Sequence, residues 1–248
     1  MLNLRGRSLA SGHYSGTIVL VSERGIPVAD CGEHPVFGVR AGMQKAFADR
    51  LKSGQVPGCA VLIFCDDPLE GISDMLSSAE IPAVCGLRSS FFENGDRVVV
   101  EGDLGNVTLS DVTGRRVVNC IVKSGEKFLL LKRSDRVGSF QGKWAAVSGY
   151  VEEGESPEIT AYRELKEEIS LSEPLLLKKG DPVVTRKGTT AWISYPFLFD
   201  VHGGKEDISL DWEHTEYRWV LPQEMGEFET VPGLLGSLHS LGISGRAK

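Results

Sequence analysis

Residues 149–171 read GYVEEGESPEITAYRELKEEISL, and the spacing of the acids in this stretch decides what the second half of the chain can be. Glu164, Glu167 and Glu168 stand at positions i, i+3 and i+4. On an α-helix this spacing places the three side chains on one face, about 5–6 Å apart, where like charges repel each other. A hard divalent cation would remove that repulsion. Mg²⁺ fits best, because it prefers carboxylate oxygens together with waters and substrate phosphates.

The helix that would carry these acids has a clear start signal. Ser156 is a candidate N-cap, Pro157 suits the first helical position, and Glu158 complements the helix dipole in the first turn. We therefore predict a helix over residues 157–169. One face is expected to be apolar and buried, with the three glutamates on the opposite side. The predicted apolar stripe consists of Ile159, Tyr162, Leu165 and Ile169.

The same stretch resembles the Nudix box of the Nudix hydrolases. The matching positions are Gly149, Glu155, Arg163-Glu164-Leu165, Glu167-Glu168 and Leu171. One position departs from the family pattern, because Ser170 stands where the family usually has glycine. Glycine there would serve as a left-handed helix exit, and serine has a steric cost in that conformation.

The resemblance implies a hydrolase that cleaves a nucleoside diphosphate linked to another moiety, with water attacking phosphorus and Mg²⁺ or Mn²⁺ as cofactor. It implies a metal site formed by Glu164, Glu167, Glu168 and the backbone carbonyl of Ser148. It also implies that Glu155 pairs with Arg163 and holds the loop against the helix. A metal ion lowers the pKa of bound water and clamps the negative oxygens of a pyrophosphate, which is the main demand of this chemistry.

The general base is left open between two acids, Glu164 and Glu213. Residues 210–220 resemble the strand that follows the box in many Nudix proteins, where an acid precedes a strand that contains Trp. Here Glu213 precedes Trp219. For the neighbouring His214, a structural or exposed position is favoured over a catalytic one. Candidate phosphate contacts are Lys132, Arg133, Arg136 and Lys143. Candidate stacking rings are Trp144, Trp192, Tyr195, Trp212 and Trp219, with core packing favoured for Trp144 and Trp219.

A second class of function remains open: a Nudix-fold module that senses a nucleotide or regulates without cleaving. The intact acids favour the hydrolase, because a pure binder has no need for a repulsive cluster. In either case the expected substrate or ligand is a small nucleotide or diphosphate.

The length of 248 residues predicts two domains, over residues 1–110 and 111–248. The expected fold class is α/β and α+β: a swivelling-type β/β/α domain, then a Nudix α/β/α sandwich with a mixed sheet. In the second domain, residues 117–123 and 128–132 are predicted to form a hairpin. In the first, strands are predicted at 16–21, 58–64, 81–84, 97–101 and 106–109, and helices at 41–51 and 69–77.

The first half loosely resembles the swivelling domain of phosphoenolpyruvate-using enzymes through residues 79–86 and 94–102. The phosphate-carrying members have a histidine ahead of the Ile-Pro-Ala-Val segment, and residues 68–75 contain none. A phosphohistidine carrier is therefore not expected. A scaffold, a dimerisation module or a module that gates the substrate is the favoured hypothesis for this half.

Composition limits the remaining possibilities. The chain is 41% hydrophobic and 25% charged, without an apolar run long enough for a membrane span or a signal peptide, so we expect a cytoplasmic protein that does not bind membranes. A net charge of −7 argues against nucleic-acid binding. A homodimer is possible. The five cysteines, which are expected to be small buried hydrophobes rather than disulfide or zinc ligands, are Cys31, Cys59, Cys65, Cys85 and Cys120.

Overall fold

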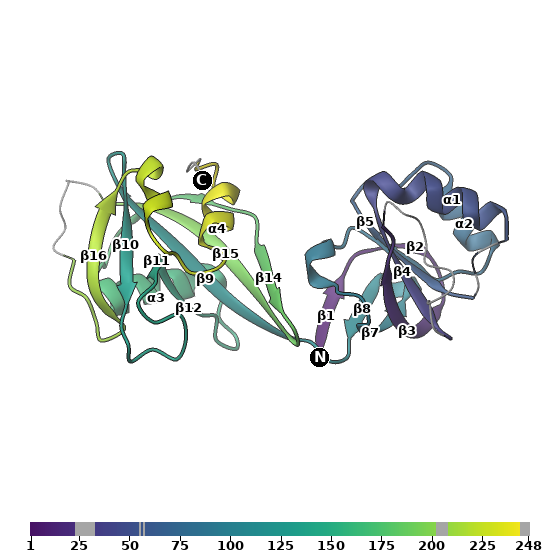
Figure 1. The fold of residues 1–248 in the computed structure, drawn as a ribbon, viewed down its shortest axis with the longest axis horizontal. Helices are drawn as coiled ribbons and strands as arrows, with labels where there is room; N and C mark the ends of the chain where they lie inside the picture. Colours follow the sequence, from purple (N-terminus) through teal and green to yellow (C-terminus); the bar gives the residue numbers. More distant parts are fainter. Residues whose placement is uncertain (23–32, 55, 57, 202–207, 244–248) are drawn as a thin grey trace. The chain divides into compact units, whose positions relative to one another are not determined.

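The computed structural model describes residues 1–22, 33–54, 56, 58–201 and 208–243 (Figure 1). The chain divides into two compact units. Unit 1 comprises Met1–Gly114 and Arg186–Ala191, and unit 2 comprises Arg115–Thr185 and Trp192–Lys248. Among the described residues, no helix combines the length and the apolar character that crossing a membrane requires.

Unit 1 is built on an eight-stranded mixed sheet with the order β1-β8-β7-β3-β4-β5-β6-β2. Its strands are β1 (Leu2–Arg5), β2 (Arg7–Ala10), β3 (His13–Leu20), β4 (Pro35–Arg40), β5 (Ala60–Phe64), β6 (Ala83–Cys85), β7 (Arg97–Glu101) and β8 (Asn106–Leu109). Strands β3 to β6 run parallel, and the other pairings are antiparallel.

The two ends of this sheet are formed by one segment of chain. Only Gly6 separates β1 from β2, yet β1 pairs with β8 and β2 pairs with β6. The sheet therefore closes on itself. Gly6 is needed at the junction, because a Cβ there would lie 2.2 Å from the carbonyl oxygen of Cys85.

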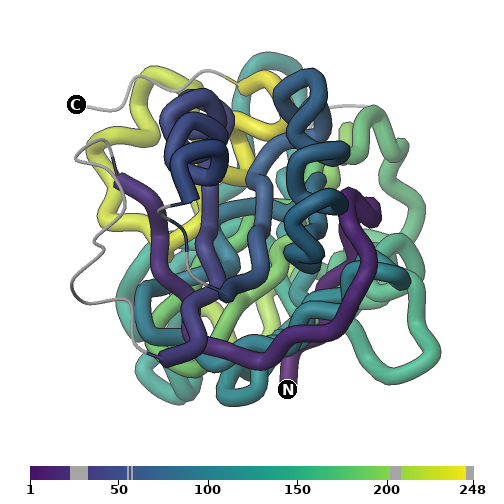
Figure 2. Tube along the Cα trace, turned by 90° about the vertical axis from the view of Figure 1, so that its right-hand side faces the viewer, coloured from purple at the N-terminus to yellow at the C-terminus, as the bar shows by residue number. Residues whose placement is uncertain are grey.

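Two helices cover one side of this sheet, α1 (Gln44–Lys52) and α2 (Ile72–Ser78) (Figures 1 and 2). Phe47 and Leu76 pack into one core together with Phe37 of β4 and Ile63 of β5. Short 3₁₀ turns lie at η1 (Ala41–Met43), η2 (Ser89–Phe91) and η3 (Gly102–Leu104). The predicted helices and strands of this half are confirmed to within a few residues, whereas β1, β2 and β4 were not predicted.

Unit 2 contains most of the second sheet, in the order β11-β10-β9-β15-β13, with β12 paired to β9, β14 to β15 and β16 to β10. Its strands are β9 (Thr113–Ser124), β10 (Lys127–Arg133), β11 (Trp144–Ala145), β12 (Val147–Tyr150), β13 (Leu175–Lys179), β14 (Val183–Lys187), β15 (Thr190–Asp200) and β16 (His214–Val220). The antiparallel pair β9–β10, in which Ser124 faces Lys127, confirms the predicted hairpin.

The second sheet carries a helix on each face (Figure 1). Alternation along β9 explains this arrangement: Val118 and Val122 belong to the core under α3 (Pro157–Ile169), and Ile121 belongs to the core under α4 (Leu234–Ser240). A 3₁₀ segment, η4 (Pro222–Glu227), precedes α4. Strands buried on both faces, with helices outside them, give the layered α/β arrangement expected for this half.

Cys59, Cys85 and Cys120 are buried, as predicted, and Cys65 is partly exposed. These four thiols are free. Cys31 lies outside the described residues.

Candidate active site

Helix α3 begins and ends as the sequence predicts. The hydroxyl of Ser156 accepts a hydrogen bond from the backbone N–H of Ile159 (3.3 Å), and Pro157 is the first helical residue. At the other end Ser170 has φ 59° and ψ 23°, the left-handed conformation that usually requires glycine. The helix that carries the acids therefore ends in backbone strain at the one residue that departs from the family pattern.

The predicted apolar stripe of α3 is partly wrong. Leu165 and Ile169 are buried, but Ile159 is 60% exposed and Tyr162 lies at the surface. The buried face of the helix also carries Glu164 and Glu168, while only Glu167 of the three acids is exposed. The acids are therefore not all opposite the core, as the sequence suggested.

Gly149 provides the room for this arrangement. It lies on β12, which packs against α3. A Cβ on Gly149 would lie 2.0 Å from the carboxyl carbon of Glu164, far inside contact distance. The missing side chain lets a carboxylate occupy the space between helix and strand.

Glu168 is the most buried of the acids. Its Oε1 accepts a hydrogen bond from the backbone N–H of Ser148 (3.2 Å). Its Oε2 has no hydrogen-bond partner among the described residues. Burial raises the pKa of Glu168 well above its ordinary value, and the nearby charges of Glu164 and Glu213 raise it further.

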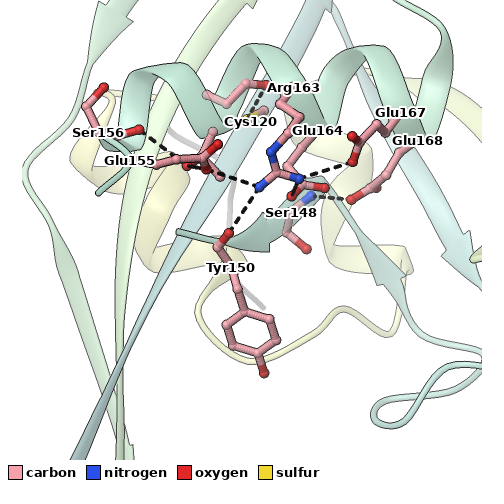
Figure 3. Close-up of polar contacts among 11 residues, drawn as sticks. Cys120, Ser148, Tyr150, Glu155, Ser156, Arg163, Glu164, Glu167 and Glu168 are labelled. Atoms are coloured by element: carbon pink, nitrogen blue, oxygen red, sulfur yellow. Dashed lines mark hydrogen bonds and ion pairs between the residues drawn. The ribbon is translucent and has the colours of Figure 1, made fainter. Parts of the chain in front are cut away.

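Arg163 holds the acids of this site together (Figure 3). Its guanidinium lies 3.3 Å from Glu155 Oε2, which is the predicted ion pair, and it donates to the carbonyl oxygen of Tyr150 (3.3 Å). It also lies 2.8 Å from Glu164 Oε1 and 3.1 Å from Glu167 Oε2. These last two contacts were not predicted. A single cation therefore offsets part of the repulsion between the acids.

The pKa values of the paired acids shift in opposite directions. Hydrogen bonds from Thr160 and Arg163 lower the pKa of Glu155. Burial raises the pKa of Glu164, although Arg163 opposes that rise. Hydrogen bonds thus favour the ionised form of Glu155, which braces the loop, whereas burial opposes the charge on Glu164.

Glu213 lies within electrostatic range of both buried acids, because its charge raises the pKa of Glu164 and of Glu168. Its backbone carbonyl accepts a hydrogen bond from Ser134 (2.7 Å), and the N–H of Asp211 donates to the carbonyl of Glu168 (3.1 Å). Burial and the nearby Asp211 raise the pKa of Glu213 itself. The structure thus brings this candidate base to the acids of α3.

The proximity of Asp211 and His214 to Glu168 was not predicted. The ring of His214 is buried, with Nδ1 3.4 Å from Asp211 Oδ1 and 3.7 Å from Glu168 Oε2. Burial lowers the pKa of His214. The favoured structural position of this histidine agrees with its burial, but its contacts with site acids were missed. The one feature of the sequence that could have predicted these contacts is the set of acids around His214, which are Asp211, Glu213 and Glu216.

The four candidate phosphate contacts all have partners within the protein. Lys132 lies 3.8 Å from Glu216, Arg133 donates to the carbonyl of Ser139, and Lys143 lies 2.9 Å from Glu229. Arg136 lies over the ring of Trp212, 5.2 Å from its centroid.

The five candidate rings differ in exposure. Trp144 is buried against Phe228, as favoured, and Trp219 packs against the core under α3. Trp192 and Tyr195 are partly buried, and Arg116 lies over Tyr195. Trp212 is 52% exposed.

The donors of this site fit a hard divalent cation. All the side-chain donors are carboxylates, and Oε2 of Glu168 is buried without a hydrogen-bond partner. Among the described residues, no three acidic, histidine or cysteine side chains already converge as ligands, since Glu164 and Glu167 turn toward Arg163. The chemistry of the donors therefore supports the predicted metal, while the arrangement of the ligands stays a prediction.

Comparison with known proteins decides the family. Residues 113–238 match the NUDIX domain, and this match spans half of the chain. The chain belongs to the Nudix family. This Nudix chain is 29% identical over 142 residues to a protein named nucleoside triphosphatase NudI from Salmonella paratyphi B, a match that covers 53% of the chain and 96% of the relative.

Solved structures similar to this Nudix chain include a MutT protein from Methanosarcina mazei (26% identity, TM-score 0.44, covering 52% of the chain and 91% of that protein). Another is the dihydroneopterin triphosphate pyrophosphohydrolase of E. coli (18% identity, TM-score 0.42, covering 51% and 95%). Because residues 113–238 match the NUDIX domain, the chain is an enzyme of the Nudix hydrolase type. The family match begins at residue 113, so the resemblance of the first half to swivelling domains stays a prediction.

Proposed function

We propose that this Nudix enzyme hydrolyses a nucleoside diphosphate linked to another group, including a further phosphate, by attack of water on phosphorus. The observation that carries the proposal is the buried Glu168 carboxylate, whose Oε2 has no hydrogen-bond partner among the described residues, beside the backbone of Ser148. A buried acid without a partner is costly to the fold and is retained where a ligand completes it. The similarity to a nucleoside triphosphatase supports the substrate class.

The residues proposed to hold Mg²⁺ or Mn²⁺ are Glu164, Glu167, Glu168 and the carbonyl of Ser148. When bound, the cation would offset the charge on the pyrophosphate oxygens and lower the pKa of water. In the reaction the oxygen of water forms a bond to phosphorus and the anhydride P–O bond breaks. Glu213 is the favoured group to take the water proton, because burial and the nearby Asp211 raise its pKa above the ordinary value and so make it a better proton acceptor, whereas Glu164 is paired with Arg163.

Arg163 and Glu155 are proposed to position the site rather than to react. Their ion pair and the bond from Arg163 to the carbonyl of Tyr150 fix the helix against the strand and loop that precede it. Without this brace, the acids of α3 would lose their relation to the backbone of Ser148.

For the nucleoside end of the substrate we propose Trp212 and Arg136. Trp212 lies between Asp211 and Glu213, and its ring is half exposed with a guanidinium over it. An exposed ring beside a phosphate-directed site suits stacking of a base, which contributes about 1–3 kcal/mol per base. The other four candidate rings are more buried.

The alternative, a sensor that binds a nucleotide without cleaving it, is less well supported. Two buried acids with raised pKa values reduce the stability of the fold, and a sensor gains nothing from that cost.

The test is a panel of nucleoside triphosphates, nucleotide sugars and dinucleoside polyphosphates, each incubated with Mg²⁺, with Mn²⁺ or with chelator. Release of phosphate, pyrophosphate or nucleotide would be measured beside a Glu167→Gln variant, whose changed side chain is exposed and should leave the fold intact. We expect metal-dependent turnover that falls by orders of magnitude in the variant. Tight nucleotide binding without turnover on any substrate would instead identify a sensor.

The remaining expectations keep the status of proposals. These are a cytoplasmic location, a possible homodimer, the absence of nucleic-acid and membrane binding, a domain boundary at residues 110/111, and a scaffold or gating role for the first half.

A further inference from the structure

His214 and Glu168 come from distant parts of the sequence and meet in the core behind the acids of α3. The side chain of His214 is 1% exposed and that of Glu168 is 4% exposed. Among the described residues, His214 Nδ1, His214 Nε2 and Glu168 Oε2 are buried without a hydrogen-bond partner. Buried polar atoms nearly always have partners, so three of them in one place need a functional explanation.

The chemistry of the three groups indicates how they pair. Ionised carboxylates can only accept hydrogen bonds, and a neutral imidazole has one N–H to donate. Nδ1 is the ring atom that faces acceptors, since it lies 3.4 Å from Asp211 Oδ1 and 3.7 Å from Glu168 Oε2. The separation of Nδ1 from Glu168 Oε2 exceeds hydrogen-bond distance by about 0.5 Å, so the two side chains need to approach each other by that amount to form the bond.

Asp211 is itself fixed by the backbone. Its Oδ1 accepts a hydrogen bond from the N–H of Glu213 (3.0 Å), and its own N–H donates to the carbonyl of Glu168 (3.1 Å). The turn that carries the candidate base is therefore attached directly to the end of α3. A proton on Nδ1 is attracted by both carboxylates, which selects the tautomer that can donate to Glu168.

We propose that His214 is a positioning residue whose Nδ1–H orients the Glu168 carboxylate for binding the divalent cation. The proposal rests on the function proposed above. With Oε1 on the N–H of Ser148 and Oε2 on His214, each oxygen keeps a lone pair for the cation. Hydrogen-bond partners behind a metal ligand commonly change metal affinity by about 10–100-fold when removed.

The position of the donor atom offers a direct test. In His214→Asn the amide nitrogen takes the place of Nδ1, in His214→Gln it takes the place of Nε2, and His214→Leu has no donor. We would measure the Mn²⁺ dissociation constant of the full chain by electron paramagnetic resonance, and kcat and KM for the best nucleotide substrate. We expect Leu and Gln to weaken Mn²⁺ binding by about 10–100-fold and to lower kcat more than they change KM. Asn should stay within about threefold of the wild type.

If His214 has only a structural role, its variants should lower the melting temperature and leave the Mn²⁺ affinity unchanged. Ser237→Ala serves as control, because Ser237 is fully buried on α4, at the opposite face of the sheet, and accepts a hydrogen bond from Asn119 (3.0 Å). It should lower the melting temperature without changing Mn²⁺ affinity. If the Leu variant fails to fold, the contrast between Asn and Gln decides. Equal Mn²⁺ affinity in Asn, Gln and wild type would overturn the proposal.

The proposed hydrolase function can be refuted independently of the proposed role of His214. A wild-type protein that binds Mn²⁺ but hydrolyses no substrate would refute the hydrolase. The Mn²⁺ affinities of the three variants would still decide the role of His214.

Discussion

Helices α3 and α4 cover opposite faces of one sheet, yet their buried faces differ in kind. The buried residues of α4 are Leu234, Leu238 and Ser237, and the one polar group among them is hydrogen-bonded to Asn119. The buried face of α3 carries two carboxylates, one of which has an oxygen without a hydrogen-bond partner among the described residues. The comparison teaches that α4 stabilises the fold, while α3 gives up stability at the site where we propose that the cation binds. Five substitutions can break or sharpen this distinction.

The largest effect is expected for Glu168→Gln. Turnover should fall by a factor of about 10³ or more, equivalent to about 4 kcal/mol, because the amide is a poor ligand for a hard cation. Since burial raises the pKa of Glu168, its ionised form destabilises the fold at neutral pH. The melting temperature in chelator should therefore stay equal or rise. A drop of several degrees would show that the buried charge supports the fold.

The counterpart on α4 is Leu238→Ala. Leu238 is 2% exposed, and its truncation should cost about 2–5 kcal/mol, measured by urea unfolding. Turnover per folded molecule should stay within about twofold of the wild type. A large loss of kcat in the folded variant would mean that the two faces are coupled.

Gly149→Ala probes the space that α3 needs for its acids. The added Cβ would meet the Glu164 carboxyl group at 2.0 Å, so the carboxylate or the helix must move. We expect kcat to fall by about 10–100-fold and stability by about 1–3 kcal/mol. Gly138→Ala is the matched control, because a Cβ there meets nothing within 4 Å. Unchanged kcat in Gly149→Ala would remove Glu164 from the site.

Trp212→Ala tests whether the substrate binds at the face of the sheet that α3 covers. Loss of base stacking should raise KM for nucleotides by about tenfold, within the range of about 1–3 kcal/mol per base. Hydrolysis of inorganic triphosphate, which has no base, should not change. Leu235→Ala, an exposed apolar residue on α4, is the control. If both variants behave like the wild type, another ring binds the base.

The smallest effect is expected for Ser170→Gly. Glycine adopts the left-handed conformation at residue 170 without steric cost, so unfolding should require about 1 kcal/mol more. Chemical denaturation measures this change. Turnover should remain the same, since Ser170 is the residue that follows the last helical residue of α3 and is not one of the proposed site residues. A loss of stability would show that the serine hydroxyl matters more than the backbone strain.

Local signals made part of this structure predictable. The cap at Ser156, the proline after it and the strained exit at Ser170 define α3 within a few residues of chain, and the β9–β10 hairpin is equally local. The ion pair of Glu155 with Arg163 followed from the resemblance to the Nudix box. These features depend on neighbours in the sequence or on a spacing that recurs in a family.

The predictions that were wrong or missing concern features that depend on contacts between distant parts of the chain. Helical periodicity placed Ile159 and Tyr162 in the core, but the neighbouring strand presents Gly149 to α3 and so admits Glu164 instead. The contact between Glu168 and His214 depends on the pairing of β16 with β10. The spacing of residues along α3 carries no information about that pairing. Strands β1 and β2 were missed because each is only four residues long and is stabilised by partners far along the chain.

The closure of the sheet in unit 1 has a consequence for how the chain folds during synthesis. Leu2 pairs with Leu109, and Arg7 pairs with Cys85. Strand β1 therefore waits for β8, the last strand of its sheet in chain order, and closing so long a loop slows folding. Until β8 has emerged, β1 remains an open edge that can pair with other chains. Substitutions in β1 or β2 that weaken their pairing with β8 and β6 should therefore reduce the yield of folded protein.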